Sequence, residues 1–270
     1  MVGQPFDTVK VRLQSSNLYN GTADAARRIA KDEGLKGFYK GTLTPLIGVG
    51  ACVSIQFGVF EGMRRWYHQR HARAGQSTQL SSKEFYISGA MAGLISSFVS
   101  CPVEHIRIRL QTQVGVAKLF YGPIDCTRKI VAQGGITRLF RGQTPTMIRD
   151  AHGMGMYFLA YEACVDADIR RNHVARDQIP GFRLCGYGAV AGFAMWIAAY
   201  PIDVVKSRMQ TDALEVSQQR YRSTWNCITK ILQVNGWRGF LRGFTPVLLR
   251  AGPVNAATFV TFETALRFIG

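Results

Sequence analysis

The chain has 270 residues, of which 47% are hydrophobic, and its formal net charge is +16. Its mean hydropathy of +0.01 is too polar for a simple membrane bundle, but the charges are unevenly distributed, so the uncharged windows are more informative than the average. The basic residues alternate with these windows instead of forming an aromatic-interleaved patch, which argues against a nucleic-acid-binding protein.

The first element is a charged motif, Pro-x-acid-x-x-base-x-base, that begins at Pro5. It recurs at Pro102 and Pro201, so a unit of about 100 residues occurs three times. Residues 1–4 stand where about 20 apolar residues are expected, so we expect one transmembrane segment to be largely absent, as in a truncated chain. Each copy of the motif ends on a glutamine: Gln14, Gln111 and Gln210.

A short amphipathic helix is predicted after each motif, at residues 19–33, 121–133 and 221–234. Each is followed by a window of 20 residues with few charges, at 41–60, 142–161 and 243–262. A helix of this length spans about 30 Å, the thickness of the bilayer hydrocarbon core. Two further uncharged runs, 85–103 and 184–202, end at the acid of a motif, which makes five candidate membrane spans.

The runs that lead into the second and third motifs carry proline and glycine at matching places. The helix at about residues 83–101 is predicted to bend at Pro102, because proline removes a helical hydrogen bond. Glycines spaced by four residues let helices approach closely in lipid. The pairs Gly89 with Gly93 and Gly188 with Gly192 therefore predict close helix packing.

The acid and the first base of each motif are three residues apart and share one helix face. Ionisable residues at membrane depth are costly and usually functional. Around a pseudo-threefold axis, each acid would meet the base of a neighbouring repeat and close a ring of three ion pairs. Such a ring would act as a gate that opens when a bound solute shifts the conformational equilibrium.

These three complete motifs resemble the signature of the mitochondrial carrier family, and the resemblance covers essentially the whole chain. It implies an all-α membrane protein of three tandem repeats, each with two transmembrane helices and a short matrix helix, in a pseudo-threefold bundle with the first helix truncated. The repeats are expected at residues 1–70, 80–170 and 180–270, together forming one transmembrane domain. The implied protein is a multi-pass, monomeric antiporter of the mitochondrial inner membrane that works by alternating access and contacts membrane lipid, above all cardiolipin.

The resemblance also implies two charged networks. The matrix gate would pair Asp7 with Arg107, Glu104 with Lys206 and Asp203 with Lys10, braced by the three glutamines. A second network on the cytosolic side, aromatic-acid-x-x-base, matches fully only at Glu61 with Arg64. Val165 and Leu266 stand where bases belong after Glu162 and Glu263, so the cytosolic gate is expected to be the weaker one.

The solute site is predicted from the positions 13 residues before the cytosolic acids, which are Gly48, Arg149 and Arg250. Arginine binds carboxylates bidentately, and the adjacent Asp150 suits the cation of a zwitterion. Arg149 with Asp150 resembles carriers of amino acids and of carnitine and its acyl esters. The segment that contains Asn255 resembles the same branch, while Gln56 adds a polar group without a decisive charge. His152 is either a solute contact or a packing residue.

The expected solute is thus small and zwitterionic or anionic, an amino acid or carnitine/acylcarnitine. A carrier of basic amino acids or other organic anions, and an inactive truncated fragment, remain alternatives. The sequence has no Gly-rich phosphate loop, metal-ligand cluster or nucleophile with a base, so neither an enzyme nor a cofactor or metal site is expected.

Overall fold

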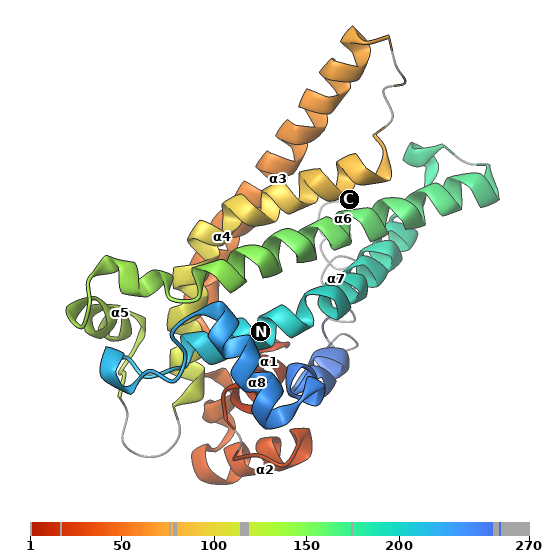
Figure 1. The fold of residues 1–270 in the computed structure, drawn as a ribbon. Helices are drawn as coiled ribbons and strands as arrows, with labels where there is room; N and C mark the ends of the chain where they lie inside the picture. Colours follow the sequence, from red (N-terminus) through yellow and green to blue (C-terminus); the bar gives the residue numbers. More distant parts are fainter. Residues whose placement is uncertain are drawn as a thin grey trace. The chain divides into compact units, whose positions relative to one another are not determined.

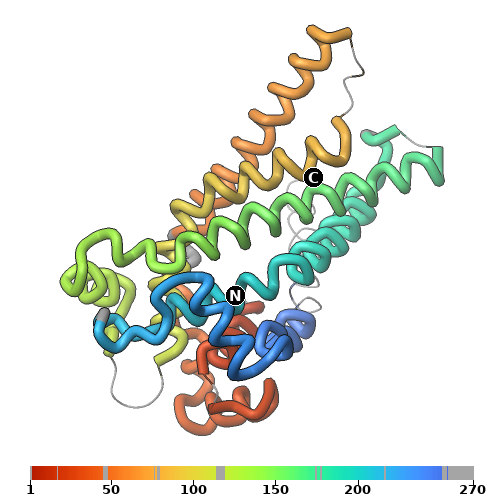
Figure 2. Tube along the Cα trace, in the orientation of Figure 1, coloured from red at the N-terminus to blue at the C-terminus, as the bar shows by residue number. Residues whose placement is uncertain are grey.

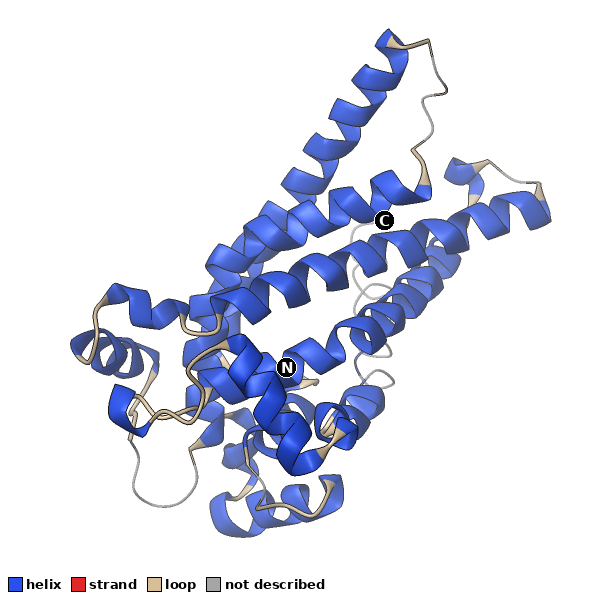
Figure 3. Ribbon diagram, viewed as in Figure 1, coloured by secondary structure: helices blue, strands red, loops and turns tan. Residues whose placement is uncertain are grey.

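The computed structural model describes residues 2–16, 18–75, 77, 80–113, 119–173, 175–250 and 254, and within them it contains helices and no strand (Figure 3). This confirms the all-α prediction. The α-helices are α1 Gln4–Ser15, α2 Thr22–Glu33, α3 Leu43–Arg73, α4 Ser82–Thr112, α5 Pro123–Ala132, α6 Gln143–Asn172, α7 Gly181–Gln210 and α8 Thr224–Asn235 (Figure 1). The short 3-10 helices are η1 Leu35–Tyr39, η2 Ile136–Phe140, η3 Arg176–Gln178, η4 Val216–Gln218 and η5 Trp237–Leu241, and residues 244–250 are also helical.

The charged motifs lie on helices that continue through their prolines. Pro5 occupies the first turn of α1, where its missing N–H is not needed. Pro102 and Pro201 lie inside α4 and α7, and both helices run on to include the motif charges. The predicted helix at 83–101 is therefore the first part of the longer α4.

The three short helices α2, α5 and α8 occur where amphipathic segments were predicted, and each begins two or three residues later than expected (Figure 2). Each buries two residues spaced by four, so one stripe of the helix faces the protein. These pairs repeat with a register of 101 residues: Ala25 and Ile29, Cys126 and Ile130, and Cys227 and Ile231. The α2 pair packs against Val9 and Leu13 of α1.

All six cysteines are free. Two of them, Cys126 and Cys227, are fully buried on the short helices. Burial raises the pKa of the Cys126 thiol to about 11 and that of the Cys227 thiol to about 12. Both side chains therefore serve as small apolar packing groups rather than as reactive thiols.

The chain divides into two compact units. Unit 1 comprises residues 1–47, 101–142 and 204–270, and it includes α1, the three short helices α2, α5 and α8, and the last parts of α4 and α7. Unit 2 comprises residues 48–100 and 143–203, and it includes α6, most of α3 and the first parts of α4 and α7.

Close packing within unit 2 is confirmed for one of the two glycine pairs. A Cβ at Gly93 would lie 2.1 Å from the Asp150 backbone oxygen, and one at Gly89 would lie 2.6 Å from that of Met154. The backbones of α4 and α6 therefore touch along this stretch. For Gly188 and Gly192 in α7, by contrast, no described atom lies closer than 3.6 Å to an added Cβ.

Two described helices are long and apolar enough to cross a membrane, α4 with mean hydropathy 1.4 and α7 with 1.5. Both were among the five candidate spans. Helices α3 and α6 reach a similar length, 31 and 30 residues, without the same apolar character. Charged groups within α6, such as Arg149 and Asp150, account for part of that difference. The fifth window, 243–262, lies largely outside the described residues.

Candidate functional site

Asp7 of α1 holds two guanidinium groups at once. Its Oδ2 accepts a hydrogen bond from Arg107 Nη2 at 2.9 Å, and its Oδ1 accepts one from Arg250 Nη1 at 3.0 Å. Gln4 Oε1 accepts another hydrogen bond from the same Arg107 nitrogen at 2.9 Å. The structure thus brings together the expected pair of Asp7 and Arg107, and it adds Arg250, which the sequence interpretation assigned to the solute.

Glu104 and Lys206 form a second ion pair in unit 1. Lys206 is only 1% exposed, and a buried ammonium group needs a carboxylate partner to stay charged. The third expected pair, Asp203 with Lys10, joins residues that belong to different units and stays a prediction. The gating role of all these residues is likewise still a prediction.

The three motif glutamines are almost completely buried, at 1% exposure or less. Gln111 Nε2 donates to Thr8 Oγ1 at 3.4 Å, and Gln210 Nε2 donates to Cys101 Sγ at 3.7 Å. Thr8 follows the gate acid Asp7, and Cys101 precedes Pro102. Gln111 and Gln210 therefore each contact a side chain at or beside a motif in another repeat, and their bracing role stays a prediction.

The second base of each motif makes a contact that sequence reasoning missed. Each of these arginines donates to a backbone carbonyl at the end of the next repeat's motif, which closes a cycle within unit 1. The contacts are Arg12 Nε to Gln111 O at 2.9 Å, Arg109 Nη2 to Asp212 O at 2.8 Å and Arg208 Nε to Gln14 O at 3.2 Å. Their repetition in the sequence was the signal that could have found them.

Arg12 also forms a bidentate ion pair with Glu33 at the end of α2, with N–O distances of 2.7 and 2.9 Å. Burial by itself would raise the pKa of Glu33, but the hydrogen bonds from Arg12 and Lys40 outweigh it and hold that pKa below its ordinary value of 4.5. The equivalent residue 101 positions on is Gly134, and the next is Asn235, whose amide oxygen accepts from Arg208. This carboxylate therefore occurs in one repeat of three.

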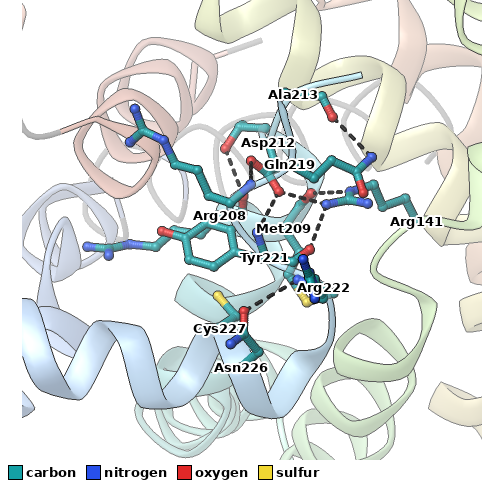
Figure 4. A network of polar contacts seen from close by, with 12 residues as sticks. Arg141, Arg208, Met209, Asp212, Ala213, Gln219, Tyr221, Arg222, Asn226 and Cys227 are labelled. Atoms are coloured by element: carbon teal, nitrogen blue, oxygen red, sulfur yellow. Dashed lines mark hydrogen bonds and ion pairs between the residues drawn. The ribbon is translucent and has the colours of Figure 1, made fainter. Parts of the chain in front are cut away.

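A polar network around Asp212 joins the second and third repeats (Figure 4). Arg141 Nη2 donates to Asp212 Oδ2 at 2.7 Å and to Tyr221 O at 3.0 Å, and its Nε donates to Met209 O at 3.0 Å. The backbone N–H groups of Arg220 and Tyr221 also donate to the Asp212 carboxylate, at 3.0 and 2.9 Å. Asp212 has no acidic counterpart in the other repeats, so the motif pattern gave no sign of it.

Arg149 and Asp150 form an ion pair in unit 2, with 2.8 Å between Nη2 and Oδ1. Ser100 Oγ donates to the other Asp150 oxygen at 2.8 Å. Arg149 Nη1 lies 3.9 Å from Asp203 Oδ1, so this arginine also reaches an acid of the charged motif. A guanidinium between two carboxylates, one of them held by a hydroxyl, can bind an incoming carboxylate and leave an acid for a cation.

In the predicted cytosolic network, the expected contact of Glu61 with Arg64 is present, and two further bases, Arg65 and Arg176, were not expected. Glu61 pairs within α3, at 3.5 Å from Arg64 and 3.3 Å from Arg65. Glu162 accepts two hydrogen bonds from Arg176 of η3, at 2.7 and 2.8 Å. A base is thus supplied from the connection after α6, where the motif spacing gave no signal for it. Glu263 lies outside the described residues.

The remaining predicted site residues are found at separate places. Gln56 Nε2 donates to Ser96 Oγ at 3.2 Å, and Gly48 is buried. The Tyr86 hydroxyl and His152 Nδ1 share a hydrogen bond of 2.8 Å, which links α4 to α6. Asn255 lies outside the described residues. Among the described residues, no group of three or more His, Cys, Asp or Glu could hold a metal ion.

The family model described as "Mitochondrial carrier protein" matches residues 1–71, 79–170 and 177–270. The glutamate/glycine mitochondrial carrier ymc1 of Schizosaccharomyces pombe is 50% identical over 100% of this chain and 90% of its own length. The mitochondrial glycine transporter YMC1 of Saccharomyces cerevisiae is 47% identical over 100% of the chain and 87% of its own length. The human mitochondrial basic amino acids transporter is 37% identical over 99% of the chain and 86% of its own length.

Proposed function

The chain belongs to the mitochondrial carrier family of multi-pass inner-membrane transporters, and we propose that it carries small amino acids, glycine or glutamate in the first place. The observation that carries this proposal is the Arg149 and Asp150 pair, whose charges complement the carboxylate and ammonium groups of an amino acid. The printed names of the two fungal relatives support the same solute class.

Arg149, Asp150 and Arg250 are the proposed solute ligands, together with Gln56 and Asn255 and with Gly48 as the small residue at the equivalent place in the first repeat. The motif pairs would form the matrix gate and the acids Glu61, Glu162 and Glu263 the cytosolic one. Transport would proceed as antiport by alternating access, in which a solute with unequal affinity for the two gated states shifts the balance between them.

Basic amino acids form the second candidate class. The human relative is named for them, and Asp150 offers an acid for a cationic group. Carnitine is a weaker candidate, since the relatives named above are amino-acid carriers. All three classes belong in the same uptake experiment.

An anionic lipid, cardiolipin, is the proposed membrane partner of a monomeric protein. A hollow of about 460 Å³ in unit 1 is lined by Tyr19, Asn20, Gly21, Arg242 and Gly243, among others. The N–H groups at the start of α2 and the Arg242 guanidinium could hold a phosphate there. This supports a lipid headgroup as the ligand.

The test is uptake of radiolabelled glycine by liposomes that contain the purified protein and are loaded with glycine, glutamate, lysine or carnitine. Wild type should exchange glycine for internal glycine or glutamate. Arg149→Ala should lose tenfold or more of that rate, because a charged hydrogen bond contributes about 1.5–3 kcal/mol. Arg171→Ala is the matched control, since Arg171 is exposed near the end of the same helix, α6.

Three outcomes would contradict the proposal. If the protein exchanged lysine or carnitine but neither glycine nor glutamate, the solute class would be different from the proposed one. Equal rates for Arg149→Ala and wild type would remove Arg149 from the site. No uptake of any solute would favour an inactive carrier.

A further inference from the structure

Asp7 belongs to two contacts with different expected roles. One is the gate pair with Arg107 of the second repeat, and the other is the pair with Arg250 of the third. Arg250 Nη1 lies 3.0 Å from Asp7 Oδ1 and 3.2 Å from Oδ2, so it grips both carboxylate oxygens. Arg250, a residue proposed to bind the solute, is thus already paired with a carboxylate of the protein.

A weaker version of the same contact occurs in the next repeat. Arg149 stands 101 residues before Arg250, and its Nη1 lies 3.9 Å from the gate acid Asp203. Asp150 is the nearer partner there, at 2.8 Å. In the first repeat the same register position is Gly48, which has no side chain to offer, and the gate acid Glu104 pairs with Lys206.

The carboxylate of an amino acid has the same chemistry as the carboxylate of Asp7, so the two compete for the N–H groups of Arg250 Nη1. We propose that Asp7 is a built-in competitor for Arg250, and that the carboxylate of the solute displaces it. This inference rests on the proposed function, in which Arg250 is a solute ligand.

Displacement of Asp7 would couple binding to gating. With Arg250 in place, Asp7 links α1 to two other repeats, and with solute on Arg250 it keeps the link to Arg107 alone. The closed gate therefore has one ion pair fewer when solute is bound. As a result, the affinity for solute is higher in the open state than in the closed state.

This competition also predicts selectivity for a carboxylate. An analogue without that group, such as glycinamide, has no means of taking Arg250 from Asp7. Glycinamide would leave both ion pairs of Asp7 intact even where its ammonium group binds. The requirement for a carboxylate is then part of the gating step and not of affinity alone.

The test is the Kd for glycine of the purified full-length chain in detergent, measured by calorimetry for Asp7→Asn and Glu104→Gln. Both variants weaken the matrix gate by one acid, but only Asp7 competes for a proposed solute arginine. Because the ion pair of Asp7 with Arg250 is partly exposed, removal of this competitor should lower the Kd for glycine about two- to fivefold in Asp7→Asn relative to Glu104→Gln. The Kd for glycinamide should show no such difference.

Thermal unfolding of each variant checks that it folds, and Asp7→Ser takes the place of Asp7→Asn if the amide does not. Equal Kd values for glycine in the two acid variants, with clear binding by wild type, would overturn the competition and leave the proposed function intact. A decrease in the Kd for glycinamide as large as that for glycine would overturn the competition as well. If wild type bound neither glycine nor glutamate, the proposed function and the inference would fail together.

Discussion

Replacement of Gly93 by alanine tests the backbone contact between α4 and α6. A Cβ at this position would lie 2.1 Å from the Asp150 oxygen and 2.5 Å from its carbonyl carbon, whereas ordinary contact begins at 3.4 Å. Because both of these atoms belong to the backbone, no side-chain rotation can relieve the clash, and the helices must separate. Overpacking costs about 1–3 kcal/mol, and the upper end of that range applies here.

The assay is thermal unfolding of the purified protein in detergent. At about 2–4 °C per kcal/mol, Gly93→Ala should lower the midpoint by roughly 6–12 °C. Gly58→Ala in α3 is the control, because Gly58 is exposed and no described atom lies within 4 Å of an added Cβ. Alanine in an exposed helix stabilises by about 0.4–1 kcal/mol, so this midpoint should stay or rise. Equal midpoints for Gly93→Ala and wild type would refute the packing argument.

Two more substitutions test ion pairs that the sequence did not predict. Glu33→Gln should lower the free energy of unfolding by about 1–3 kcal/mol at neutral pH, because Arg12 loses a carboxylate partner. Since folding lowers the pKa of Glu33, its contribution is complete above the ordinary value of 4.5 and disappears as pH falls through the folded-state pKa. The midpoints of Glu33→Gln and wild type should converge in acid, and a difference that persists there would contradict the assignment. Arg176→Ala should cost about 1–2 kcal/mol because it strands the buried Glu162, while the exposed pair removed by Arg65→Ala should cost at most about 0.5 kcal/mol; equal losses in thermal unfolding would argue against a special role for Arg176.

The sequence predicted what depends on spacing along one helix. The order of charges around Pro5, Pro102 and Pro201 and the stripes of the three short helices repeat at fixed intervals, so their helical placement could be inferred without coordinates. The glycine pair at Gly89 and Gly93 gave correct close packing because small residues at one face have few other uses in a membrane helix.

Partners that depend on the path of the chain could not be found in this way. Arg176 reaches Glu162 because the connection after α6 turns back, and no periodic pattern encodes that turn. Asp212 lies just past a motif and has no acidic counterpart to reveal it. Arg250 and Asp7 are 243 residues apart, so their contact depends on how repeats one and three pack within unit 1.

The repeats differ at equivalent positions, and these differences provide the unlike groups that an amino acid needs as binding partners. Three identical repeats would present the same group three times, whereas an amino acid has one α-carboxylate and one α-ammonium group that need unlike partners. At the register of 48, 149 and 250 the chain carries glycine, arginine and arginine, and an acid follows only the second. The same holds beside the charged motifs, where the equivalent residues are Glu33, Gly134 and Asn235. Glu33 forms an ion pair with Arg12, Asn235 accepts a longer hydrogen bond from Arg208, and Gly134 has no side chain to offer. In the proposed gate, three pairs of unequal strength would open unevenly, and the pair of Asp7 is the one that we expect a solute carboxylate to weaken most.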